Sequence, residues 1–73
     1  MKSDIKDRID IKLATKIREA REKKALTQAE VAKQAKVTET YYAMTERGET
    51  NPSLAKLNRM LETLGLKILV KKA

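Results

Sequence analysis

Glycine and proline interrupt this chain at only three positions, Gly48, Pro52 and Gly65. The sequence before Gly48 is rich in Ala, Lys, Glu, Gln, Leu and Met, which have a high helix propensity. We therefore expect several helices, and the 73 residues contain no internal repeat or low-complexity linker that would divide them. A single domain of this size buries only roughly 60% of its unfolded surface, so we also expect a homodimer.

The residue types that the chain lacks exclude several classes of function. Cys and His are both absent, which excludes disulfide bonds, thiolate metal sites, zinc fingers and catalysis by imidazole or cysteine. No apolar run approaches the ~20 residues of a membrane span, and there is no signal-peptide pattern. We predict a cytoplasmic binding module that is not an enzyme, with no catalytic residue, no metal, no cofactor and no membrane partner.

The charge of the chain suggests the kind of partner. Its 17 basic and 10 acidic residues give a formal net charge of +7, which favours a polyanion, nucleic acid before membrane. A solvated domain can also be basic without binding anything. The surplus lies in the flanks, because residues 1–24 and 54–73 each carry a net charge of +4 and residues 25–53 carry −1. The evidence for DNA must therefore come from the motif in the middle of the chain.

Residues 1–12 are predicted to form an N-terminal arm, for which two patterns compete. Apolar residues recur every four positions from Ile5 to Ile17, which extends the first helix upstream. The stretch from Ile9 to Leu13 instead alternates apolar and charged residues, as in a short strand. The first regular helix is predicted from about Leu13 to Lys24.

Two capped helices are predicted next. Thr27 and Glu30 have the spacing of a capping box, which predicts a helix over residues 28–35. After a turn, Thr38 can cap a second helix over residues 39–47, and Gly48 can end it in a left-handed conformation.

The fourth predicted helix begins after the turn residues Asn51-Pro-Ser and ends at Gly65. It completes a main domain that spans residues 13–65. Its leucines are predicted to face the core: Leu54, Leu57, Leu61 and Leu64. Residues 66–73, which include the β-branched Ile68 and Val70 and alternate in part, are predicted to form a short C-terminal strand.

The second and third predicted helices have the dimensions of a helix-turn-helix. Ala32 is the small residue where the two helices cross, Val37 is an apolar plug in the turn, and Tyr42 faces the core from the second helix. The outward positions of that second helix are polar or adaptable, as contact with base edges requires.

Four motifs in a fixed order extend this interpretation: Thr27-Gln-Ala-Glu-Val-Ala, Glu46-Arg-Gly, Asn51-Pro-Ser-Leu and Leu64-Gly-Leu. In these motifs and their spacing the chain resembles the Cro/cI (Xre) family of helix-turn-helix proteins, roughly from Ile17 to Leu66. The resemblance implies an all-α, λ-repressor-like helix-turn-helix bundle of four to five helices. It also implies sequence-specific binding of double-stranded operator DNA in the major groove, as a homodimer on a palindromic site.

Carried over onto this sequence, the family pattern implies three sets of functional residues. The residues that would contact bases are Thr38, Glu39, Thr40, Tyr41 and Met44. The residues that would contact backbone phosphates are Thr27, Gln28, Arg47, Asn51 and Lys56. Arg21 and Glu46 match a structural pair that joins the first helix to the end of the recognition helix. The chain departs from the pattern at Lys36, where Gly is common, and at Thr45, where Ile or Leu is preferred.

The C-terminal stretch Gly65-Leu-Lys-Ile-Leu-Val resembles the ending of HigA/HipB-type antitoxins. That resemblance implies a strand that pairs across a dimer or with a toxin protein, formed by Leu64, Leu66, Ile68 and Val70. We therefore expect a transcriptional regulator that represses its own toxin–antitoxin operon. The alternatives are a restriction–modification controller protein, a phage-type repressor, or an antitoxin whose main role is toxin binding.

Overall fold

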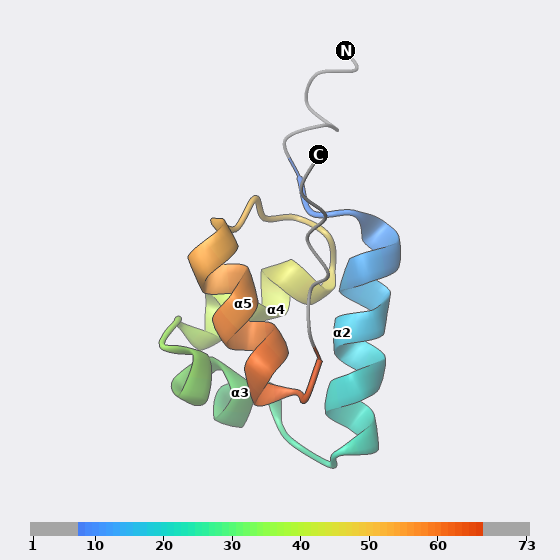
Figure 1. Ribbon diagram of the computed structural model, residues 1–73, viewed down its shortest axis with the longest axis vertical. Coiled ribbons are helices and arrows are strands. Elements are labelled where there is room, and N and C mark those ends of the chain that lie inside the picture. The colour runs from blue at the N-terminus through green and yellow to red at the C-terminus, as the bar shows by residue number, and fades with distance from the viewer. Residues whose placement is uncertain (1–7, 67–73) are drawn as a thin grey trace, which may run out of the picture.

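The computed structural model describes residues 8–66, which contain four helices and no strand. The helices are α2 (Ile11–Lys23), α3 (Gln28–Ala35), α4 (Glu39–Glu46) and α5 (Leu54–Thr63). Figure 1 shows α2 along one side of the molecule, with α3, α4 and α5 grouped on the other. Helix α3 contacts both α4 and α5, and α2 packs against α4. The all-helical bundle predicted from the sequence is confirmed for this part of the chain.

Each helix begins at a polar side chain that accepts a backbone N–H. The caps are Asp10, Thr27, Thr38 and Ser53. Helix α2 starts two residues earlier than predicted because the Asp10 carboxylate accepts from the amide of Lys12 at 3.0 Å. Residues 11 and 12 are therefore helical, and the alternative of a strand from Ile9 to Leu13 is wrong.

The turns between helices use left-handed backbone at several residues. Gly48 follows α4 with a φ of 78°, as its place in the sequence predicted. Lys36 ends α3 with a φ of 62°, and Ala25 follows α2 with a φ of 56°. A residue with a Cβ is strained there by roughly 1 kcal/mol relative to Gly.

One hydrophobic core lies between the four helices. Its largest fully buried apolar side chains are Ile17, Val31, Tyr42 and Met60, so the inward prediction for Tyr42 is confirmed. Leu54 was predicted to be buried but is 58% exposed, because it is the first residue of α5 and lies at the helix end.

The predicted C-terminal strand is not seen at its described end. Leu64 is the C-cap of α5 and belongs to the core, so it is not a strand residue. Leu66 packs partly against the same core, and its amide donates to the carbonyl of Leu61 at 2.8 Å. Ile68 and Val70 lie outside the described residues.

Ile9 joins the start of the described chain to the loop after α4. Its side chain is buried, and its amide donates to the carbonyl of Thr50 at 2.7 Å. The Thr50 hydroxyl is also buried, 2.9 Å from that of Thr45. Since the Thr45 hydroxyl donates to the carbonyl of Tyr41, Thr50 must be the donor between the two hydroxyls.

Candidate nucleic-acid interface

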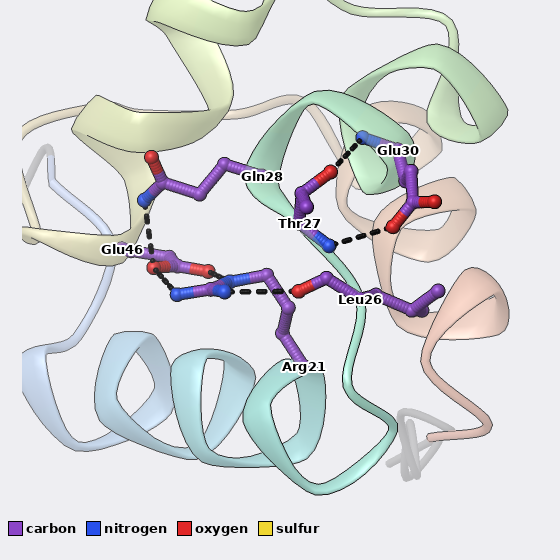
Figure 2. A network of polar contacts seen from close by, with 6 residues as sticks. All are labelled: Arg21, Leu26, Thr27, Gln28, Glu30 and Glu46. Atoms are coloured by element: carbon purple, nitrogen blue, oxygen red, sulfur yellow. Dashed lines mark hydrogen bonds and ion pairs between the residues drawn. The ribbon is translucent and has the colours of Figure 1, made fainter.

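Helices α3 and α4 are both short, and a three-residue turn joins them. Both halves of the predicted capping box are present, with Thr27 Oγ1 accepting from the Glu30 amide at 3.0 Å and Glu30 Oε1 accepting from the Thr27 amide at 2.8 Å (Figure 2). At the turn, the amide of Val37 donates to the carbonyl of Ala32 at 3.0 Å. Val37 is half-buried against the core, in the position predicted for the apolar plug.

The residues predicted to contact bases are concentrated at the start of α4. Thr38, Glu39 and Thr40 are exposed, whereas Tyr41 and Met44 are half-buried. Thr38 also caps the helix, because its Oγ1 accepts from the amide of Tyr41 at 3.0 Å. The first turn of α4 therefore presents two hydroxyls and one carboxylate to solvent, groups that can accept from or donate to base edges.

A network of side chains fixes the other end of α4 to the helices around it (Figure 2). Glu46 forms a two-armed ion pair with Arg21, from Nε to Oε2 at 2.6 Å and from Nη2 to Oε1 at 3.1 Å. Arg21 also donates to the carbonyl of Leu26 at 3.0 Å. The structure thus brings together Arg21 and Glu46 as the sequence comparison implied, and the pair links α2 to α4.

Gln28 belongs to the same network, which the sequence did not predict. Its side-chain Nε2 donates to Glu46 Oε1 at 3.0 Å, so the first residue of α3 is joined to the last residue of α4. Gln28, which is predicted to contact phosphate, is half-buried, and one of the two hydrogens of its side-chain amide is already bonded to Glu46. Its own backbone N–H, at the N-terminus of α3, points outward from the helix end as an additional donor.

Burial and hydrogen bonding act in opposite directions on the Glu46 carboxylate, whose side chain is 3% exposed. Burial alone would raise the pKa of Glu46, but the hydrogen bonds from Arg21 and Gln28 and the nearby Tyr42 hydroxyl lower it below its usual range. The hydrogen bond to Glu46 in turn raises the pKa of Arg21. Glu46 therefore remains ionised and paired in the folded protein.

Tyr42 lies beneath this network. Its hydroxyl is buried and makes no hydrogen bond of standard geometry to any described residue. Burial, and then the adjacent Glu46 carboxylate, raise the pKa of Tyr42 well above its usual range. The phenol is therefore a neutral part of the core.

The remaining residues predicted to contact phosphates lie around α4 on exposed positions. Arg47 is 58% exposed and pairs with Glu49, which is 43% exposed, at 3.1 Å. Asn51 is exposed in the next loop, and Lys56 is exposed on the first turn of α5. The Lys56 ammonium lies 4.8 Å from the centre of the Tyr41 ring.

Two further contacts that hold the motif together were missed from the sequence. Arg59 on α5 donates from Nε to the carbonyl of Ala35 at 2.8 Å, which satisfies the end of α3. Thr45 and Thr50 form the buried hydroxyl pair. The Thr at position 45, where the family prefers Ile or Leu, was a signal in the sequence for a buried polar contact. Nothing in the sequence indicated that Thr50 would be its partner.

No group of three carboxylates lies close enough among residues 8–66 to hold a metal ion. In the same range, no helix is both long and apolar enough to cross a membrane.

A capped helix, a tight left-handed turn and a second helix with an exposed polar first turn define a helix-turn-helix module. The family model for helix-turn-helix domains (HTH_3, the Cro/cI type) matches residues 17–70. The chain therefore belongs to the helix-turn-helix family.

A curated relative is similar over most of the chain. The HTH-type transcriptional regulator DdrOP3 of Deinococcus deserti is 34% identical over 58 residues, which are 80% of this chain. The match covers 45% of that relative's length. No solved structure matches the chain.

Proposed function

We propose that this chain is a transcriptional regulator that binds double-stranded DNA sequence-specifically through α4. The observation that carries the proposal is the exposed, polar first turn of α4, whose opposite end is fixed by the Arg21–Glu46–Gln28 network. A recognition helix must present side chains to base edges at a defined angle, and a rigid anchor supplies that angle. The Deinococcus relative is a transcriptional regulator, which supports the same function.

The finer part of the proposal is that the chain acts in the cytoplasm as a homodimer and represses its own toxin–antitoxin operon. It rests on the antitoxin-like sequence after Gly65, most of which lies outside the described residues. We propose further that the chain has no catalytic activity and acts only by binding. A main role in toxin binding is the competing function, favoured by the same C-terminal sequence.

Selection from a randomised duplex library, followed by mobility shifts on the selected site, tests DNA binding. We expect a salt-sensitive complex with one preferred sequence. Thr40→Ala should change that preference, because Thr40 is exposed on the first turn of the helix that we propose enters the major groove. Gln28→Ala should weaken binding to all sequences alike, because Gln28 supports the position of α4 and the backbone contact at α3.

Two outcomes would contradict the proposal at different levels. If no sequence is enriched, or if binding does not respond to salt, the chain is not a sequence-specific regulator. If Thr40→Ala and Gln28→Ala weaken binding to every sequence equally, α4 does not read bases through Thr40.

Co-expression with the product of the adjacent gene tests the antitoxin role. We expect the chain to co-purify with that product, to suppress its toxicity, and to bind the promoter of its own operon. A neighbour that is neither bound nor toxic would remove the antitoxin role while leaving the DNA-binding proposal intact.

A further inference from the structure

An open cleft of about 400 Å³ lies beside the start of α4. It is lined by residues of the α3–α4 turn, of α4 and of α5: Lys36, Val37, Thr38, Tyr41 and Lys56. Two of these five carry an ammonium group, and two carry a hydroxyl. The acidic residues of the motif do not line it, so the cleft is more basic than the slightly acidic segment 25–53 around it.

Tyr41 holds one of the two ammonium groups in place. Its ring is half-buried and packs against the core, and the Lys56 ammonium lies over it at 4.8 Å from the ring centre. A cation over an aromatic face is attracted to it, and the side chain loses part of its freedom before any ligand arrives. The side chain that was predicted to contact a base is therefore placed to orient Lys56 instead.

Lys36, which also lines the cleft, ends α3 in a strained left-handed conformation. It is exposed at a φ of 62°, where Gly would be less strained. Strain of this kind persists only where the surrounding structure offsets it, and it motivates the question of what the Lys36 side chain does. The hydroxyl of Thr38 is also at the cleft, and because it accepts from the Tyr41 amide, its hydrogen can still be donated.

We propose that this cleft is a binding site for a DNA backbone phosphate, which would be bound by Lys36, Lys56 and the Thr38 hydroxyl. Tyr41 would be the positioning residue for Lys56. The inference rests on the proposed DNA-binding function and adds the residues that fix α4 along the backbone. A phosphate bound beside the first turn of α4 would set the register of Glu39 and Thr40 on the bases. Lys36 and Lys56 also place positive charge at the cleft, beside a motif whose own net charge is negative.

The salt dependence of binding to the selected duplex, measured with the full chain, tests this phosphate-binding site. We expect Lys36→Gln and Lys56→Gln each to weaken binding about tenfold at low salt and to reduce the slope of log affinity against log salt by about 1. The sequence preference should not change. Lys23→Gln is the matched control, because Lys23 is exposed on α2 and lies across the molecule in another groove.

Substitution of Tyr41 separates positioning from direct contact. Tyr41→Phe keeps the aromatic face and should retain the wild-type slope, whereas Tyr41→Leu should lower the slope toward that of Lys56→Gln. In the Lys56→Gln background, Tyr41→Leu should add little. Thermal unfolding of each variant identifies any loss that comes from the fold.

The outcomes distinguish this inference from the function on which it rests. If the wild type binds its site selectively but Lys36→Gln and Lys56→Gln match Lys23→Gln, the cleft does not bind phosphate and the proposed function stands. If Tyr41→Leu changes the sequence preference instead of the slope, Tyr41 contacts a base and is not a positioning residue. If the wild type shows no selective binding, the proposed function fails and the inference fails with it.

Discussion

Glu46 is the residue on which the orientation of α4 depends most directly. Its carboxylate is almost fully buried and accepts from Arg21 on α2 and from Gln28 on α3. A buried charge is tolerated only when its hydrogen-bonding capacity is met. Loss of Arg21 would leave the buried Glu46 charge with Gln28 as its remaining hydrogen-bond donor in this network, whereas loss of Gln28 would leave the Arg21–Glu46 pair in place.

Removal of Arg21 alone should be more costly than removal of the pair. We expect Arg21→Met to lower the free energy of unfolding by roughly 3 kcal/mol, because it leaves the Glu46 charge buried. The double variant Arg21→Met/Glu46→Met should regain part of that loss. Urea unfolding measures both, and Arg47→Met is the control, because its exposed pair with Glu49 should contribute about 0–1 kcal/mol. A double variant less stable than Arg21→Met would contradict the account.

The lowered pKa of Glu46 makes a prediction about acid. A carboxyl whose pKa is lower in the folded than in the unfolded chain contributes stability above its unfolded pKa, about 4.3 for Glu. That contribution should be lost as the pH falls through the lower, folded value. Unfolding free energies measured across this range should fall more steeply for the wild type than for Glu46→Gln. Parallel curves for the two proteins would show that Glu46 is not stabilised in its charged form.

At the scale of the helices, the sequence predicted best what local chemistry determines. The bounds of α3 were predicted to the residue, and those of α4 within one residue, because Thr27 and Thr38 are strong caps. The pairing of Arg21 with Glu46 followed from the family pattern. The exposed turn of Thr38, Glu39 and Thr40 also follows from its place just after a cap.

Contacts between distant segments could not be predicted in this way. Ile9 belongs to an apolar spacing that continues into α2, but nothing near it in the sequence indicates that its amide donates to the carbonyl of Thr50. Leu54 continues the leucine spacing of α5, yet it is exposed because the bundle does not extend over the end of the helix. The hydrogen bond from Gln28 to Glu46 could not be predicted from the sequence, because it depends on the angle between α3 and α4.

Ala25 and Lys36, the residues at positive φ after α2 and at the end of α3, allow effects on folding stability to be distinguished from effects on DNA binding. Ala25→Gly and Lys36→Gly each replace an L-residue at positive φ, so each should raise the free energy of unfolding by roughly 0.5–1 kcal/mol. Only Lys36→Gly removes a charge from the cleft, and it alone should weaken DNA binding. The two variants are matched, and the measurements are urea unfolding and mobility shift. Equal affinity for DNA in both variants would show that the strain at Lys36 has no binding role.

For the whole molecule, the charge is separated from the recognition surface. The segments on either side of the motif each carry +4, whereas residues 25–53 carry −1. Under the proposed function, long-range attraction to DNA would come from the flanks, and discrimination would come from short-range contacts of α4. The Lys36–Lys56 cleft is the place where positive charge lies directly beside the recognition helix.

Removal of residues 67–73 should show whether they are needed for folding or for dimerisation. A chain that ends at Leu66 keeps Leu64 and Leu66 against the core, so its unfolding transition should remain cooperative. If the strand proposal holds, sedimentation should show a monomer that binds a palindromic site more weakly than the full chain does. Because the truncation also removes three lysines, the full chain with Lys67, Lys71 and Lys72 changed to Gln is the control. A truncated chain that is still a dimer would overturn the strand proposal.

The hydrogen bond between Ile9 and Thr50 connects the stability of the chain's beginning to that of the recognition helix. Local opening at the start of α2 exposes the Ile9 amide and releases the Thr50 loop, which in turn holds Thr45 on α4 through the buried hydroxyls. In hydrogen exchange, the Ile9 amide should therefore be protected to the same degree as amides of α4, despite its place ahead of the first described helix. Additions at the N-terminus that disturb Ile9 would consequently loosen α4 through Thr50 and Thr45.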